Sequence, residues 1–217
     1  MLLPFHNTLM IQTNPQIAVI KSELEKRGWL LLNMQSEEDL NQIIEYLGEV
    51  IYETDVTVNS ESKGMVTSSR GLDFHTDHHK AKYIVWHCIY QTDQGGESIL
   101  IDAENIYMKL PSEDQIALKQ IQLYEHKVFE DDAESHPLVY VDENGIISFY
   151  YSFWLLRKAD EKNSALLAFQ SLLRKSNQFR FKMQPKDILI VNNHKILHGR
   201  TPITGTKTRF LKRFWIK

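Results

Sequence analysis

Apolar positions divide the chain into a helical first part and a β-rich remainder. Residues 17–27 place apolar side chains at helical spacing, and Gly28 follows them as a favourable helix terminator. Residues 29–34 (WLLLNM) form a short apolar run that predicts a buried strand. A second helix is expected to begin at Ser36, because the residues after it have the form of a capping box.

From Leu72 onward, the pattern changes to short segments rich in β-branched and aromatic residues. These predicted strands are residues 82–90, 98–101, 138–141, 146–151, 187–191 and 209–216. Two predicted helices, residues 112–124 and 160–176, interrupt them. Many short strands with few helices predict a fold that is mainly β with flanking helices, a jelly roll with its helices packed outside. A generic α+β domain is the alternative.

The chain has no repeat, low-complexity tract or linker-like stretch, so we expect residues 1–217 to form a single domain. Within it, residues 58–71 are small and polar and include two glycines, a composition typical of a mobile loop.

Composition excludes several classes of protein. The net charge of -3 lacks the basic signature of a nucleic-acid binder, and no apolar stretch reaches the ~18 residues needed to span a membrane. The first residues have no basic segment or small-residue cleavage site, so no secretion signal is expected. Cys88 is the single cysteine, which agrees with a reducing, cytoplasmic location.

Residues 74–79 (FHTDHH) carry the most informative chemistry. Side chains two apart on a strand share a face, so His75 and Asp77 point together. They would be two of the three ligands of a 2-His-1-carboxylate triad, which suits non-haem Fe(II). The third ligand would come from a distant strand, and His198 is the candidate because it follows an apolar strand and a turn. A hydrogen-bonded His–Asp pair without a metal is the alternative.

Two arginines follow His198 across a turn that contains proline and glycine. We expect a hairpin there, whose return strand brings Arg209 beside the His198 strand, where its guanidinium can hold a carboxylate. Arg213 shares a strand face with Arg209, and two inward arginines are costly to bury without anionic partners. Salt bridges to carboxylates at the edge of the core are the alternative.

Five segments, taken in order, resemble the taurine dioxygenase/clavaminate synthase family of Fe(II)- and 2-oxoglutarate-dependent oxygenases, which have a double-stranded β-helix. They are residues 75–77 (HTD), 95–102 (GGESILID), 136–139 (HPLV), 193–200 (NHKILHGR) and 209–213 (RFLKR). The resemblance extends over roughly residues 17–217. It implies that His75, Asp77 and His198 bind Fe(II), and that Arg209 and Ser98 hold the distal carboxylate of 2-oxoglutarate. Ser98 stands where the family often has threonine.

The resemblance also implies a reaction, in which O2 and 2-oxoglutarate hydroxylate an unactivated C–H bond and release succinate and CO2. Hydroxylation or desaturation is favoured over halogenation, because halogenating members lack the carboxylate ligand that Asp77 supplies. Arg213 would bind the acid group of a small anionic or amino-acid-like substrate. The chain is short for the family, with little room for the insertions that often cover the substrate, so the resemblance leaves the role of a lid to residues 58–71. The other candidate substrate-binding residues are Ser68 and Ser69 in this expected lid, and His79.

Two alternatives belong to other classes. A non-catalytic jelly-roll protein could keep a metal site for binding or sensing, although it would not need Arg209. A zinc hydrolase could use His194 and His198, which are four residues apart, but the strand-like residues before them argue against the helix such a pair needs. The sequence leaves open whether the substrate is free or bound to a carrier or peptide, and it leaves the oligomeric state open.

Overall fold

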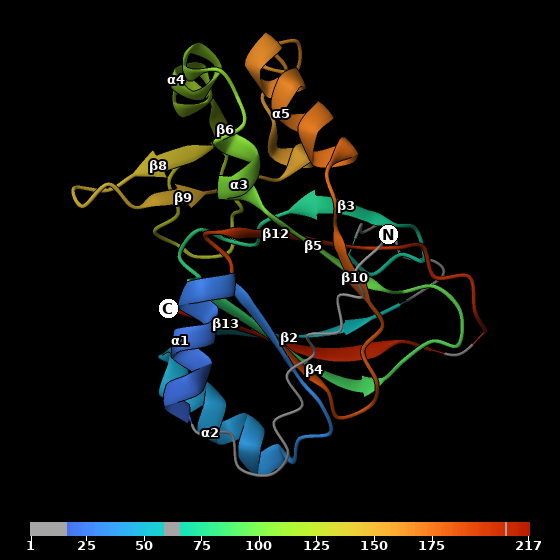
Figure 1. Cartoon of the computed structure of the whole chain (residues 1–217). Helices are drawn as coiled ribbons and strands as arrows, with labels where there is room; N and C mark the ends of the chain where they lie inside the picture. Colours follow the sequence, from blue (N-terminus) through green and yellow to red (C-terminus); the bar gives the residue numbers. More distant parts are fainter. Residues whose placement is uncertain (1–16, 59–65, 207) are drawn as a thin grey trace, which may run out of the picture.

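The protein is described by a computed structural model that covers residues 17–58, 66–206 and 208–217. Two antiparallel sheets face each other, and helices cover their outer sides (Figure 1). This arrangement confirms the predicted jelly roll with flanking helices. Residues 59–65 of the expected lid lie outside the described residues.

The larger sheet has five strands in the order β1-β11-β4-β13-β2. Its strands are β1 (Trp29–Leu32), β11 (Ile188–Asn192), β4 (Tyr83–Tyr90), β13 (Phe210–Ile216) and β2 (Val50–Thr57). Side chains alternate along β13. Leu211 and Trp215 face the space between the sheets, whereas Phe214 and Ile216 face the outer helices.

The smaller sheet has four strands in the order β10-β5-β12-β3. They are β10 (Phe179–Phe181), β5 (Ser98–Asp102), β12 (Ile196–Arg200) and β3 (Leu72–His75). Apolar side chains of this sheet, among them Leu100 and Ile196, meet Leu189 and Leu211 of the larger sheet in the core between the layers.

Two helices cover the outer face of the larger sheet (Figure 1). They are α1 (Ile17–Arg27) and α2 (Glu37–Leu47). Ser36 and Asp39 form the predicted capping box at the start of α2. Gly28 ends α1 at a φ of +76°, a conformation that favours glycine over residues with a side chain.

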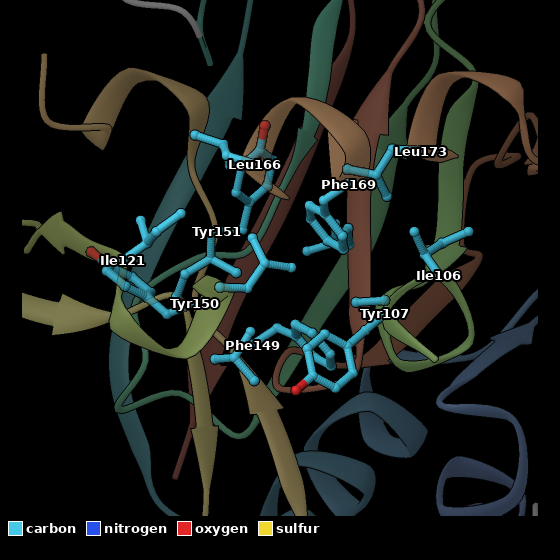
Figure 2. Close-up of a cluster of buried hydrophobic side chains, with 14 of the residues drawn as sticks. Ile106, Tyr107, Ile121, Phe149, Tyr150, Tyr151, Leu166, Phe169 and Leu173 are labelled. Carbon is cyan, nitrogen blue, oxygen red and sulfur yellow. The ribbon is translucent and has the colours of Figure 1, made fainter. Parts of the chain in front are cut away.

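A second group of elements packs beyond the smaller sheet (Figure 1). It contains α3 (Ala103–Tyr107), α4 (Ser112–Gln120), α5 (Ser164–Lys175), the 3-10 helix η1 (Phe153–Leu155), and the strand pairs β6 (Gln122–Tyr124) with β7 (Ser135–Pro137) and β8 (Val139–Val141) with β9 (Ile147–Phe149). Figure 2 shows the aromatic core of this group, in which Phe149 stacks with Phe169 and meets Tyr107 edge-on.

The predicted hairpin between the His198 strand and the Arg209 strand is wrong. Strand β12 already lies between β5 and β3, so it has no free edge for a further strand. The chain after β12 instead crosses to the larger sheet, where β13 pairs with β4 and β2. Arg209 therefore faces His198 across the interior of the jelly roll rather than beside it in one sheet.

Two helix boundaries differ from the predictions, and the short strands β7 and β10 and the edge strand β2 were not predicted. The helix expected over residues 112–124 ends at Gln120, because Ile121 and Leu123 are buried with the two-residue period of β6. Residues 160–163 precede α5, which begins after the side chain of Asn163 caps it. Strand β2 was not predicted, because it is an edge strand with few buried side chains.

Among the described helices, none combines the length and the apolar character that crossing a membrane requires.

Candidate functional site

His75, Asp77 and His198 come together at one end of the space between the sheets. Each contributes one potential ligand atom, and these atoms lie within 4.8 Å of one another. Asp77 Oδ1 is 4.0 Å from His75 Nε2 and 3.9 Å from His198 Nε2. All three residues are buried. Strand β3 ends at His75, so Asp77 lies just beyond the strand on which it was predicted.

The two imidazoles present lone pairs suited to a metal ion. His75 Nδ1 donates to the carbonyl of Asp73 at 2.9 Å, which leaves Nε2 unprotonated in the neutral ring. His198 Nε2 is buried and has no hydrogen-bond partner in the described chain. Burial lowers the pKa of both rings, that of His198 to about 3, so both are neutral at pH 7. These residues fit a divalent metal ion.

Two donors from β13 hold the carboxylate of Asp77. Arg213 Nη1 lies 3.1 Å from both carboxylate oxygens, and Trp215 Nε1 donates to Oδ2 at 2.9 Å. Burial alone would raise the pKa of Asp77, but Arg213 and the two histidines outweigh it and hold this pKa at about 2. The carboxylate is therefore charged and carries the one negative charge among the three candidate ligands.

Asn193, in the turn between β11 and β12, fixes the backbone around Asp77. Its side-chain oxygen accepts from the Asp77 N–H at 2.8 Å, and its amide donates to the carbonyls of His78 and Ala81 at 3.1 and 3.0 Å. Asn193 is fully buried. One side chain thus ties the segment that carries Asp77 to the turn that leads into the His198 strand.

A cavity opens beside the metal-ligand group, between the two sheets. Its polar lining consists of His75, Ser98, His198, Arg200, Arg209 and Arg213, and its apolar walls come from both sheets. The structure therefore brings the predicted cosubstrate residues Ser98 and Arg209 to the same cavity as the two histidines.

Arg209 is a buried cation at this cavity. It is 4% exposed, and its Nε has no hydrogen-bond partner among the described residues. Burial, followed by the neighbouring positive charge of Arg200, lowers the pKa of Arg209 to about 9. A buried guanidinium in such surroundings favours an anionic ligand.

Arg200 holds the described end of the expected lid. Its guanidinium donates to the carbonyls of Val66, Ser68 and Arg70, and Val66 lines the cavity. Ser68 is buried, and the carbonyl of Ser69 accepts from the Ile203 N–H at 2.8 Å. Both predicted serines thus lie in a segment that is tied to the end of the His198 strand.

The structure groups His79 with a second set of side chains rather than with the cavity. His79 Nε2 is hydrogen-bonded to Glu125, and the ring stacks on His136 with centroids 4.0 Å apart. His78, His79 and Glu125 also have ligand atoms within 4.8 Å of one another.

Hydrogen bonding at His78 distinguishes this second set from the first. His78 Nδ1 accepts the Lys80 N–H at 3.1 Å, so Nε2 carries the proton of the neutral ring. Nε2 lies 3.1 Å from Oδ1 of Asp132, without the alignment of a hydrogen bond. This tautomer is opposite to that of His75, and it leaves Nε2 without a lone pair for a metal ion. Asp132 instead forms an ion pair with Lys80, whose Nζ lies 2.9 Å from Oδ1.

Sequence reasoning missed several neighbours of the site. The side chain of Asp132, which no sequence motif includes, is fully buried between His78 and Lys80. The motifs also include neither Trp215, whose Nε1 donates to Asp77, nor Trp154, whose ring centroid lies 5.0 Å from that of His75. Tryptophan in a β-rich chain ordinarily indicates core packing, so no sequence signal marked these two.

The fold and the site together define a jelly-roll protein with a 2-His-1-carboxylate centre. Residues 5–215 match the family described as "Taurine catabolism dioxygenase TauD, TfdA family". The chain belongs to this family, which confirms the resemblance found in the sequence.

Two curated relatives are dioxygenases. The chain is 28% identical over 152 residues to gamma-butyrobetaine dioxygenase from Homo sapiens, a match that covers 59% of this chain and 39% of the relative. It is 24% identical over 194 residues to mitochondrial trimethyllysine dioxygenase from Bos taurus, covering 77% of this chain and 46% of the relative. The chain spans less than half the length of the curated relatives it matches.

Solved structures share the fold at low sequence identity. Asparagine oxygenase in complex with Fe(II), 2S,3S-3-hydroxyasparagine and succinate superposes with a TM-score of 0.74 at 15% identity, covering 92% of this chain and 77% of the other. The non-heme iron oxygenase OrfP in complex with Fe and alpha-ketoglutaric acid superposes with a TM-score of 0.71 at 17% identity, covering 94% of this chain and 80% of the other.

Proposed function

We propose that this protein is an Fe(II)- and 2-oxoglutarate-dependent dioxygenase that hydroxylates a small anionic or amino-acid-like substrate with release of succinate and CO2. One observation carries the proposal: a buried 2-His-1-carboxylate group and a buried arginine, Arg209, meet at one cavity. A non-catalytic metal-binding or sensor protein would need the first feature but not the second.

His75, Asp77 and His198 are proposed to hold Fe(II). Two neutral imidazoles and one carboxylate give the ion a net single positive charge and occupy one face of its coordination sphere, which leaves cis positions open. When bound, the iron and 2-oxoglutarate supply the oxidising power with O2, and the protein supplies position and shelter from water. The intact Asp77 ligand favours hydroxylation over halogenation.

Arg209 and Ser98 are proposed to hold the distal carboxylate of 2-oxoglutarate. Both line the cavity next to His198 and both are buried, so the guanidinium would meet the carboxylate in a water-poor setting, where charge-assisted hydrogen bonds are strong. The cosubstrate would also supply a partner for Arg209 Nε, which has none among the described residues.

Arg213 is proposed to face the acid group of the primary substrate. Its Nη1 is engaged with Asp77, whereas its Nε is buried without a partner in the described chain. The Val66–Arg70 segment, with Ser68 and Ser69, is proposed to form the near wall of the substrate site. A substrate-binding role of His79 and a cytoplasmic location stay predictions from the sequence.

Succinate formation tests this function. Protein loaded with Fe(II) under anaerobic conditions is mixed with 2-oxoglutarate, O2 and one member of a panel of free amino acids, small sulfonates and peptides. The proposal expects substrate-stimulated succinate release that Arg209→Ala abolishes and Lys212→Ala preserves, since Lys212 lies on the opposite face of the same strand. Failure of the wild-type protein to bind 2-oxoglutarate in the presence of Fe(II) would overturn it.

A further inference from the structure

We propose that Trp215 is a positioning residue for the metal centre, whose indole N–H fixes one oxygen of Asp77 and thereby presents the other oxygen to the metal. This inference rests on the proposed function, because it takes His75, Asp77 and His198 as the ligands. It adds to them a residue outside the ligand set.

The two oxygens of Asp77 have different surroundings. Oδ2 accepts the Trp215 Nε1–H at 2.9 Å, whereas Oδ1 lies 4.0 and 3.9 Å from the Nε2 atoms of His75 and His198. The terminal torsion of an aspartate is soft, so an unrestrained carboxylate exchanges its two oxygens readily. A fixed donor on Oδ2 removes this freedom and leaves Oδ1 as the oxygen that faces the histidines.

Arg213 cannot make the same distinction. Its Nη1 lies 3.1 Å from Oδ1 and 3.1 Å from Oδ2, so it stabilises the negative charge without favouring either oxygen. The charge of Asp77 is therefore stabilised mainly by Arg213, and its orientation by Trp215.

Packing fixes the direction of the indole N–H. Trp215 is 4% exposed. Its ring centroid lies 4.8 Å from that of Tyr52, 5.9 Å from that of His78 and 6.5 Å from that of Phe129. The Arg213 guanidinium lies over the same ring at 5.2 Å. With neighbours on several sides, the ring cannot turn its N–H away without disturbing the core.

Indole is well suited to this task. It donates one hydrogen bond, accepts none and carries no charge, so it neither competes for the metal nor changes the charge of the ligand set. Outer hydrogen-bond partners of metal ligands typically change metal affinity by about 10- to 100-fold when removed.

The test compares Trp215→Phe with Trp29→Phe. Phenylalanine keeps an aromatic ring in the core and removes the N–H. Trp29 is the control, because its ring stacks on Phe181 and lies tilted against Phe179, so its substitution removes an indole away from the ligands. Co(II) is titrated anaerobically into each metal-free protein, and its visible absorption gives both the dissociation constant and a signature of the coordination geometry. Melting temperatures are measured without metal.

For Trp215→Phe, we expect a rise in the Co(II) dissociation constant of about 10- to 100-fold and an altered absorption spectrum. Trp29→Phe should keep the wild-type affinity and spectrum. Wild-type affinity and spectrum in Trp215→Phe would overturn the inference and leave the ligand assignment intact. So would equal losses of affinity in the two variants, which would indicate general destabilisation. If wild-type protein binds no Co(II), the proposed function itself fails.

Discussion

His75 and His198 are direct partners in the antiparallel pairing of β3 with β12, and their ring centroids lie 4.3 Å apart. Opposed residues in such a pair have side chains on the same face of the sheet. The distance between these two candidate ligands is therefore set by strand register, although they are 123 positions apart in the chain. A slip of one residue would turn one of the rings to the other face.

Removing the buried charge of Arg209 tests the cosubstrate site. Arg209→Ala should weaken binding of 2-oxoglutarate by about 2–5 kcal/mol, the usual cost of losing one member of a buried charged pair. Calorimetric titration of 2-oxoglutarate into the metal-loaded protein measures it. Lys212→Ala removes a cation from the opposite face of the strand and should leave the affinity unchanged. Equal affinity in Arg209→Ala and wild type would refute the role of Arg209.

Arg213 is expected to act on the primary substrate. Arg213→Ala should raise the KM for an anionic substrate and leave the KM for 2-oxoglutarate nearly unchanged. The unchanged KM for 2-oxoglutarate would distinguish Arg213→Ala from Arg209→Ala, which should raise it.

Because Arg213 also contacts Asp77, its removal should lower the melting temperature of the metal-free protein. A lower melting temperature with no change in the substrate KM would show that this arginine is only the partner of Asp77. A large rise in the 2-oxoglutarate KM would show that the roles of the two arginines are reversed.

Asn193 should be sensitive to replacement for a structural reason. Asn193→Ala leaves the Asp77 N–H and two carbonyls without their partner in a buried region, and each such loss costs about 1–3 kcal/mol. Both the melting temperature and the affinity for metal should fall. The control Asn144→Ala, at the exposed turn between β8 and β9, should change neither. A stable Asn193→Ala protein with normal metal affinity would contradict this account of the turn.

Cys88 should be inert in the native protein. It is fully buried on β4, and burial raises the pKa of its thiol to about 11, so the reactive thiolate is scarce at pH 8. Ellman's reagent at pH 8 should react slowly with the native protein and rapidly once denaturant unfolds it. Rapid stoichiometric reaction in the native state would show that β4 opens readily.

The sequence predicted the strands whose buried faces are continuous, and the motifs that lie on them. Residues 82–90 and 209–216 became β4 and β13 with bounds shifted by one residue at most. Strand β2 was missed because Val56 is its only buried side chain among the residues described there. Local periodicity reports burial, so an exposed edge strand leaves little trace.

Which strands pair depends on information that local pattern does not contain. The hairpin predicted before Arg209 failed because β3 and β5 occupy both edges of β12, and these strands lie far back in the chain. The candidate ligands could be predicted, because strand alternation and an ordered series of motifs point to them, and the structure brings these three residues together. The contact between Trp215 and Asp77 was not predicted, since it depends on how the two sheets pack against each other.

The most direct test of the central claim is the anaerobic absorption spectrum of the protein with Fe(II) and 2-oxoglutarate. If His75, Asp77 and His198 hold iron beside a cosubstrate bound to Arg209, the mixture should develop the weak visible charge-transfer band of a chelated keto acid. The band should appear only when both Fe(II) and 2-oxoglutarate are present. The band should be lost in His198→Ala and retained in Lys212→Ala. Absence of the band in wild-type protein that binds Fe(II), or an undiminished band in His198→Ala, would contradict the account.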